Sequence, residues 1–154
     1  MDLSQGMAEA LALAKAAHDA GEVPVGAVLC LPDGERIVAA NTCHHTDQPL
    51  QHAELMVLQQ ACERFPREVL KASTLFVTLE PCPMCMGAIL HSHLGQLVFG
   101  SYNLGIRLKN SSACLSLFLS FSFFSGFSSF PMRIKPFLPF WSGFKPSVHP
   151  EVLR

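Results

Sequence analysis

The stretch STLFVTLEPCPMCMGAILHSHLGQLVFG (residues 73–100) contains two strand-like segments with a helix-like segment between them. "STLFVTL" (73–79) is rich in β-branched and aromatic residues, which favour a strand. "CPMCMGAILHSH" (82–93) has the length and composition of a short helix, and Pro83 suits the first turn of that helix. "QLVFG" (96–100) again predicts a strand. Such an alternation of strands and helices is typical of α/β proteins.

The residues before this stretch extend the same pattern. An Ala/Leu-rich helix is predicted from Met7 to Ala20, with Ser4 as its N-cap and Gly21 as its C-terminal stop. A strand, a turn, a returning strand, a loop and a second helix then follow, at residues 24–31, 32–35, 36–40, 41–51 and 52–65. The order α-β-β-α-β-α-β predicts an α/β domain in which helices cover a central mixed sheet.

The length and composition of the chain limit its class. A chain of 154 residues suits one globular domain better than two. Its N-terminus carries acidic residues instead of a basic region followed by an apolar block, so we expect no secretory signal and a cytoplasmic location. In that compartment, six cysteines favour metal binding or burial over disulfide formation.

The C-terminal third differs from the rest of the chain. Residues 1–90 hold eleven acidic and five basic side chains, whereas residues 91–154 hold one acidic and six basic side chains. Residues 110–132 are uncharged and rich in Phe and Ser, which leaves open a membrane-spanning helix, although the serines weaken that interpretation. We favour a poorly ordered or aggregation-prone tail. The sequence therefore predicts a core at residues 1–103 and a divergent segment at residues 104–154.

Four residues that suit metal chemistry occur in two pairs. His52 and Glu54 form "HAE" at the start of one predicted helix, and Cys82 and Cys85 form a C-x-x-C at the start of another. At a helix N-terminus both sulfurs can face one point, and the helix dipole favours thiolates. Two thiolates and one imidazole make three ligands, and the sequence offers no obvious fourth. This set favours an open, catalytic zinc site, because structural zinc is usually held by four ligands.

Glu54 completes the chemistry that these ligands suggest. It lies two residues after His52, so its carboxylate can approach the same ion without binding it. A carboxylate beside zinc-bound water can take the proton of that water and return it to a leaving group. Two alternatives remain open: Cys82 and Cys85 as a redox pair, as in thioredoxin-like folds, and a purely structural zinc site. A redox pair would not need the upstream His-x-Glu motif, and a structural zinc site would leave Glu54 without a role.

His-x-Glu followed by Pro-Cys-x-x-Cys is the signature of zinc-dependent nucleobase deaminases. "EVPVGAVL" (22–29), "HAELMVL" (52–58) and "TLFVTLEPCPMCMGAILHSHLGQLVFG" (74–100) further resemble the bacterial tRNA adenosine deaminases of that superfamily. The similarity runs from about residue 5 to about residue 103. It implies a three-layer α-β-α, cytidine-deaminase-like domain with a central mixed sheet.

The resemblance also implies a reaction. His52, Cys82 and Cys85 would bind Zn²⁺, and Glu54 would act as the general acid/base. Zinc-activated water, with Glu54 as proton shuttle, would hydrolytically deaminate adenosine to inosine in the anticodon loop of a tRNA, where base edges are accessible. The protein would be a cytoplasmic homodimer, as its relatives are.

Four further residues would contact the substrate. Asn41 matches the asparagine that hydrogen-bonds the target base, although it could also simply end the preceding hairpin. Val23 and the backbone around Ala53 would wall the pocket. Asn103 departs from the family pattern, because an aspartate that contacts the nucleic acid often stands there. A neutral side chain removes repulsion from phosphates and loses an acceptor for ribose, so the resemblance leaves the substrate range open.

Three functions therefore remain open. The first is the tRNA adenosine deaminase. The second is a deaminase of a free base or nucleoside, of the guanine or cytosine type, because "PCPMCMGA" (81–88) is also similar to guanine deaminases. The third is an inactive zinc-binding partner subunit, which the intact Glu54 disfavours. Basic residues of the C-terminal third could contact phosphates, or could be solvated charges: Arg107, Lys109, Arg133, Lys135 and Lys145.

Overall fold

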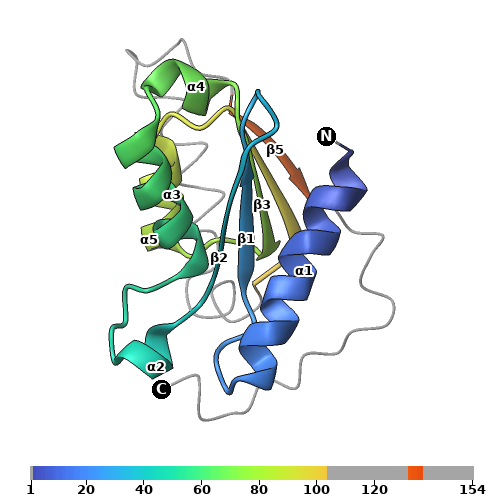
Figure 1. Cartoon of the computed structure of the whole chain (residues 1–154), viewed down its shortest axis with the longest axis vertical. Coiled ribbons are helices and arrows are strands. Elements are labelled where there is room, and N and C mark those ends of the chain that lie inside the picture. Colours follow the sequence, from blue (N-terminus) through green and yellow to red (C-terminus); the bar gives the residue numbers. More distant parts are fainter. Residues whose placement is uncertain (1, 104–131, 137–154) are drawn as a thin grey trace.

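The computed structural model describes residues 2–103 and 132–136 of the chain. They form a five-stranded mixed sheet with the strand order β2-β1-β3-β4-β5, and helices cover both of its faces (Figure 1). The elements in chain order are α1 (Leu3–Asp19), β1 (Gly26–Cys30), β2 (Arg36–Ala40), α2 (Cys43–Thr46), α3 (Ala53–Arg64), α4 (Arg67–Lys71), β3 (Thr74–Leu79), α5 (Pro83–His91), β4 (Gln96–Ser101) and β5 (Arg133–Pro136). The predicted three-layer α/β architecture is confirmed.

Helix α1 forms the first layer. Its N-cap is Asp2, whose side chain accepts a hydrogen bond from the backbone N–H of Ser4 at 3.3 Å, so the predicted cap at Ser4 is wrong. Met7 and Ala10 are fully buried against the sheet. A Cβ atom on Gly26 would lie 2.2 Å from the carbonyl oxygen of Ala10, so the close approach of the helix to β1 requires glycine there.

The predicted hairpin of β1 and β2 is present, and its register runs from Gly26 opposite Ala40 to Cys30 opposite Arg36. Every residue of β1 is buried, as expected for an inner strand with a helix on each face. β2 lies at the edge of the sheet and alternates between exposed and buried side chains over its first four residues. β3 pairs antiparallel with β1 and parallel with β4.

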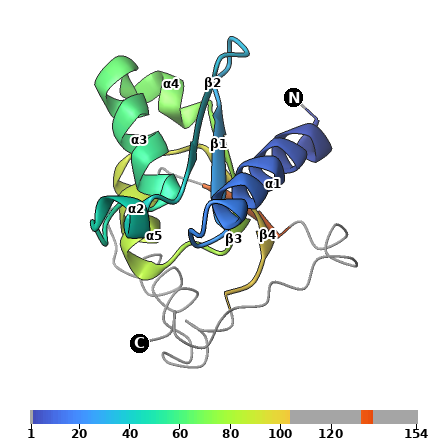
Figure 2. The same ribbon diagram turned by 60° about the horizontal axis from the view of Figure 1, so that its bottom comes forward.

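Helices α3 and α5 cover the opposite face from α1, as Figure 2 shows with α1 on one side of the sheet and both helices on the other. The main core lies between these helices and the sheet. Complete burial of an aliphatic side chain stabilises the fold by about 1.5–3 kcal/mol relative to exposure. Fully buried members of this core include Ala53, Val57, Leu75, Val77, Ile89 and Leu97.

Three short elements are absent from the sequence prediction. α2 lies within the predicted loop at 41–51, and α4 follows α3 after Pro66. β5 pairs parallel with β4 although it lies beyond the predicted core boundary at residue 103, which itself stays a prediction. Most of the uncharged stretch at 110–132 lies outside the described residues. Within the part of the chain that is described, no helix has the length and apolar character needed to cross a bilayer.

Candidate metal centre and active site

One end of the sheet gathers the residues predicted for function. β1 begins at the end where β2, β3 and β4 finish, as shown by the pairing of Gly26 with Ala40 and of Leu79 with Ser101. Such sheet ends are frequent places for ligand sites in α/β proteins. The segments that start or leave there are 22–25, 41–52, 80–82 and 102–103.

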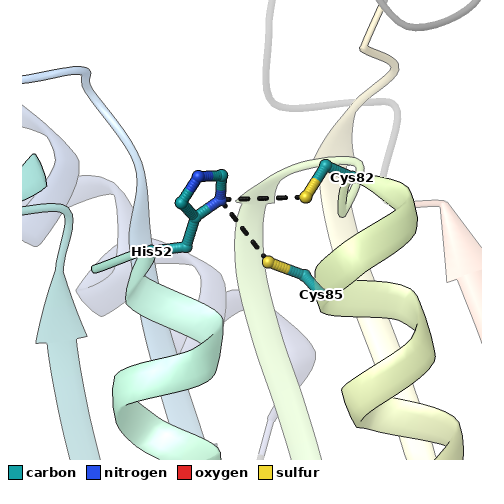
Figure 3. A group of neighbouring side chains, drawn as sticks. All are labelled: His52, Cys82 and Cys85. Carbon is teal, nitrogen blue, oxygen red and sulfur yellow. Dashed lines mark hydrogen bonds between the residues drawn. The ribbon is translucent and has the colours of Figure 1, made fainter. Parts of the chain in front are cut away.

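His52, Cys82 and Cys85 meet at this end. His52 is the N-cap residue of α3, and Cys82 is the N-cap residue of α5. The Nδ1 atom of His52 lies 3.8 Å from Sγ of Cys82 and 3.5 Å from Sγ of Cys85, and its ring faces both sulfurs (Figure 3). One ligand atom from each of the three residues lies within 4.8 Å of the others. Among the described residues, these three form the group that could hold a metal ion.

The electrostatics of the group favour a cation. A hydrogen bond from the Cys85 thiol, assisted by the His52 ring, lowers the pKa of the Cys82 thiol to about 4 against the effect of burial. The same sulfur–sulfur contact raises the pKa of Cys85. A thiolate is therefore readily available at the N-terminus of α5, where the helix dipole also favours negative charge. Two sulfurs and one imidazole nitrogen are a donor set that suits zinc.

Glu54 lies in the first turn of α3 and is only 3% exposed. Burial raises the pKa of its carboxyl group to about 7, and the Cys82 sulfur adds to this effect while His52 opposes it. Its Oε2 atom is buried and has no hydrogen-bond partner among the described residues. A buried carboxylate oxygen without a partner is unusual, because leaving such a group unpaired costs about 1–3 kcal/mol. It is available for a proton, a water molecule or a substrate.

Asn41 and Ala53 are directly bonded. The side-chain oxygen of Asn41 accepts a hydrogen bond from the backbone N–H of Ala53 at 2.8 Å, and Asn41 is 5% exposed. This contact fixes the amide orientation, because an N–H donor must face the oxygen of the amide and not its nitrogen. The Asn41 amide nitrogen is thus left to donate. The N–H of Ala53 is used within the protein, and its methyl group is fully buried.

The other two predicted substrate residues lie on neighbouring segments. Val23 lies in the segment before β1, is partly buried and packs against the main core. The backbone N–H of Asn103 donates to Oε2 of Glu80 at 3.1 Å, and the N–H of Glu80 donates to the carbonyl of Ser101 at 2.7 Å. Glu80 is 7% exposed, so a buried carboxylate holds the chain just after β4.

Sequence reasoning missed the two buried glutamates, Glu22 and Glu80. Glu22 is 5% exposed and accepts hydrogen bonds from backbone N–H groups of the loop after β2. Each glutamate lies beside a recognised motif, in "EVPVGAVL" and "EPCPMC". Their positions within these motifs were the available signal, but their acceptor roles depend on contacts between segments that are distant in sequence.

Comparison with known proteins finds a matching family model and similar sequences. A family model described as MafB19-like deaminase matches residues 1–116. A tRNA-specific adenosine deaminase of Bacillus subtilis is 45% identical over 98 residues, which cover 63% of this chain and 60% of that protein. The chain thus spans about three fifths of the length of that relative.

Two solved structures resemble the described fold. One comes from work on A-to-I editing by tRNA:A34 deaminases at the wobble position of transfer RNA. Its sequence is 37% identical, the match covers 65% of this chain and 77% of that chain, and the TM-score is 0.57. The other, guanine deaminase from Bacillus subtilis, is 23% identical with a TM-score of 0.61, and it covers 85% of this chain and 100% of its own. This second likeness concerns the fold alone. The match of the family model over residues 1–116 shows that the chain belongs to the MafB19-like deaminase family.

Proposed function

We propose that this protein is a zinc-dependent hydrolase that deaminates adenosine to inosine in the anticodon loop of a tRNA. One observation carries the proposal: His52, Cys82 and Cys85 converge beside Glu54, a buried carboxylate with one oxygen that has no hydrogen-bond partner in the part of the chain that the structure describes. Membership of a deaminase family supports the reaction type. The relatives described as acting on tRNA support the substrate.

His52, Cys82 and Cys85 are the proposed zinc ligands. A zinc ion held there would supply a Lewis acid that brings the pKa of a bound water close to neutrality. With these three protein ligands, a zinc ion would keep one coordination position for water, as in catalytic zinc sites. His52 and Cys82 are the N-cap residues of α3 and α5, so the starts of these two helices position their side chains.

Glu54 is the proposed proton carrier. Its Oε2 atom takes the proton of the attacking water and gives it to the nitrogen that leaves as ammonia. Burial raises the pKa of this carboxyl group to about 7, and a zinc cation held beside it would lower the pKa and so favour the carboxylate form that accepts the proton of water. The burial that raises this pKa also excludes bulk water as a competing proton donor.

Asn41 is the proposed contact to the base. Its side-chain oxygen is engaged by Ala53, so its amide group donates to a ring nitrogen of the purine. Val23 and the Ala53 backbone would form part of the pocket wall, and Asn103 would contact the nucleic acid near the target base. The fixed orientation of the Asn41 amide means that no reorganisation is needed when the base binds.

The runner-up is a deaminase of free guanine or cytosine. It rests on the likeness of "PCPMCMGA" (81–88) to guanine deaminases and on the fold shared with the Bacillus subtilis enzyme. We favour RNA because the relatives with higher sequence identity are described as acting on tRNA.

A substrate panel tests the proposal. Metal-loaded full-length protein is incubated with an anticodon stem-loop, with guanine and with cytosine, and ammonia and inosine are measured. Ammonia release with inosine formation from the stem-loop is expected. The Glu54→Gln variant, prepared identically, controls for contaminating deaminases. Release of ammonia from a free base alone would assign the second function instead.

Three further predictions accompany this function. The protein is proposed to be a homodimer, which light scattering of the full-length chain tests directly. The expected cytoplasmic location stays a prediction. Among the basic residues considered for phosphate contact, Arg133 and Lys135 are exposed on β5. The other three lie outside the described residues.

A further inference from the structure

Glu22 is a buried carboxylate that the proposed chemistry does not use. Its side chain is 2% exposed. One oxygen accepts a hydrogen bond from the backbone N–H of Val23 at 3.1 Å. The other oxygen accepts from the N–H groups of His44 at 2.8 Å and His45 at 3.2 Å. A single side chain therefore joins the loop before β1 to the loop after β2.

The two histidine N–H groups belong to the first turn of α2. This helix has four residues, and its N-cap residue Thr42 makes no side-chain capping bond. Isolated helices of this length are unstable, because the first turns cost more conformational entropy than their hydrogen bonds recover. Glu22 provides the missing acceptor from a distant part of the chain, and its negative charge complements the helix dipole.

This helix belongs to the loop that carries the chain from Asn41 to His52. The N–H of Asn41 donates to the carbonyl of Val25 at 3.0 Å, next to the segment that contains Glu22. The N–H of Thr42 donates to the carbonyl of Gln51 at 3.2 Å, which closes the loop immediately before His52. Between these two ends, Glu22 accepts hydrogen bonds from the first turn of α2.

We propose that Glu22 is a positioning residue that holds loop 42–51 against the segment of Val23 and thereby sets the mouth of the substrate pocket. This inference rests on the proposed function for its effect on the substrate. Within the described part of the chain, Glu22 makes hydrogen bonds and ion pairs with Val23, His44 and His45 and none with His52 or Glu54, so its role is to shape binding and not to move protons. Its loss should raise KM and leave kcat and zinc content nearly unchanged.

The size of the effect follows from the number of contacts. Replacing Glu22 by Ala removes the acceptor of three backbone N–H groups, in Val23, His44 and His45, and lets the loop shift. A displacement of about 1 Å can reduce catalytic efficiency by about 100-fold when it misplaces a substrate. Because the loop acts on binding, we expect a rise in KM of about 10-fold to 100-fold.

Glu22→Gln gives a graded test. A carboxamide has one acceptor oxygen, which can accept hydrogen bonds either from the N–H of Val23 or from the N–H groups of His44 and His45. Its NH₂ group then faces the remaining N–H donor, and those two groups cannot form a hydrogen bond. KM for Glu22→Gln should therefore lie between those of wild type and Glu22→Ala. Leu70→Ala is the matched control, because Leu70 is 3% exposed in α4, away from the loop, and its truncation lowers stability without touching this region.

The experiment uses full-length metal-loaded protein and whichever substrate the wild type deaminates. Steady-state kinetics and zinc content are measured for each variant, and hydrogen exchange is followed at the amides of Val23, His44 and His45. Faster exchange at these amides in Glu22→Ala, with raised KM and retained kcat, supports the inference. Unchanged exchange, a loss confined to kcat, or an equal rise of KM in Leu70→Ala overturns it.

The two proposals fail in different ways. A wild-type protein that is inactive on every substrate counts against the proposed function. The exchange rates of the three amides still decide whether Glu22 holds the loop, because they are measured without turnover.

Discussion

The Nδ1 atom of His52 lies 3.5 Å from the Sγ atom of Cys85, although 33 positions separate the two residues along the chain. The distance is short because α3 and α5 both begin at the end of the sheet where β2 and β3 finish. A metal ion placed there would therefore tie the starts of two helices together.

Cys85→Ala should abolish stable zinc binding, because the group would keep only two of its three ligands. The zinc content of each purified protein is measured by elemental analysis. We expect about one ion per chain in wild type and nearly none in Cys85→Ala. Cys62→Ala is the control, because Cys62 is an exposed thiol on α3 and is not part of the group. Retention of one zinc ion by Cys85→Ala would show that the ligand set is wrong.

Glu54→Gln should reduce kcat by about 100-fold to 10,000-fold while leaving zinc bound. Glutamine is nearly isosteric but cannot carry the proton from Oε2 to the leaving nitrogen. Single-turnover kinetics on the stem-loop, together with zinc content, provide the measurement. Glu63→Gln on the exposed part of α3 should have little effect. Nearly normal turnover by Glu54→Gln would remove the assigned proton carrier.

Two substitutions of Asn41 should separate its structural role from its substrate role. Asn41→Ala leaves the N–H of Ala53 without this acceptor, and we expect the free energy of unfolding to fall by about 1–3 kcal/mol. Asn41→Asp keeps an acceptor at the start of α3, where negative charge is favourable, so it should lose less stability. It lacks the donating NH₂ group, and kcat/KM should fall by about 10-fold or more. Equal activity of Asn41→Asp and wild type would contradict the proposed donor role.

Glu80 should affect RNA binding through the segment that it holds. Glu80→Ala removes the acceptor of the Asn103 N–H, and we expect KM for the stem-loop to rise by about 10-fold. Glu80→Gln keeps one oxygen for this contact and should stay within about threefold of wild type. Zinc content should be the same in all three proteins. If Glu80→Ala binds RNA like wild type, the position of Asn103 does not matter for the substrate.

The stability of the protein should depend on pH through Glu22. Burial raises the pKa of this carboxyl group. Hydrogen bonds from the N–H groups of His45, Val23 and His44 and from the His45 ring lower it by a larger amount. The pKa of Glu22 therefore lies below its usual value of 4.5. A group with a lowered pKa in the folded state stabilises the fold above the unfolded value, and this contribution is lost as the pH falls through the folded value.

The measurement is the free energy of unfolding of wild type and Glu22→Gln at several pH values. The difference in favour of wild type should be largest above pH 4.5 and should shrink as the pH falls below it. The Nδ1 atoms of His44 and His45 lie 3.9 Å and 3.3 Å from the carboxylate oxygens of Glu22. A difference that is constant from pH 7 to pH 3 would mean that the charge of Glu22 is unimportant.

The long elements and the residues of the candidate metal group could be predicted from the sequence. An apolar run such as "STLFVTL" (73–79) predicts a buried strand, and the composition of Ala53–Arg64 predicts a helix. The short elements gave no such signal. Two N–H groups of α2 donate to Glu22, which lies in another segment, and β5 pairs with β4, which lies about 30 residues earlier in the chain.

The sequence by itself determined which chemical groups are present: one imidazole, two sulfurs and a carboxylate, each placed at the start of a helix. Only the tertiary structure decided that these groups share one place, that the Asn41 oxygen is engaged by Ala53, and that Glu22 and Glu80 hold the neighbouring loops. The physical reason is the range of the interactions. Local composition selects helices and strands, whereas the pairing of a buried acceptor with a distant N–H group depends on how the whole sheet brings separate segments together.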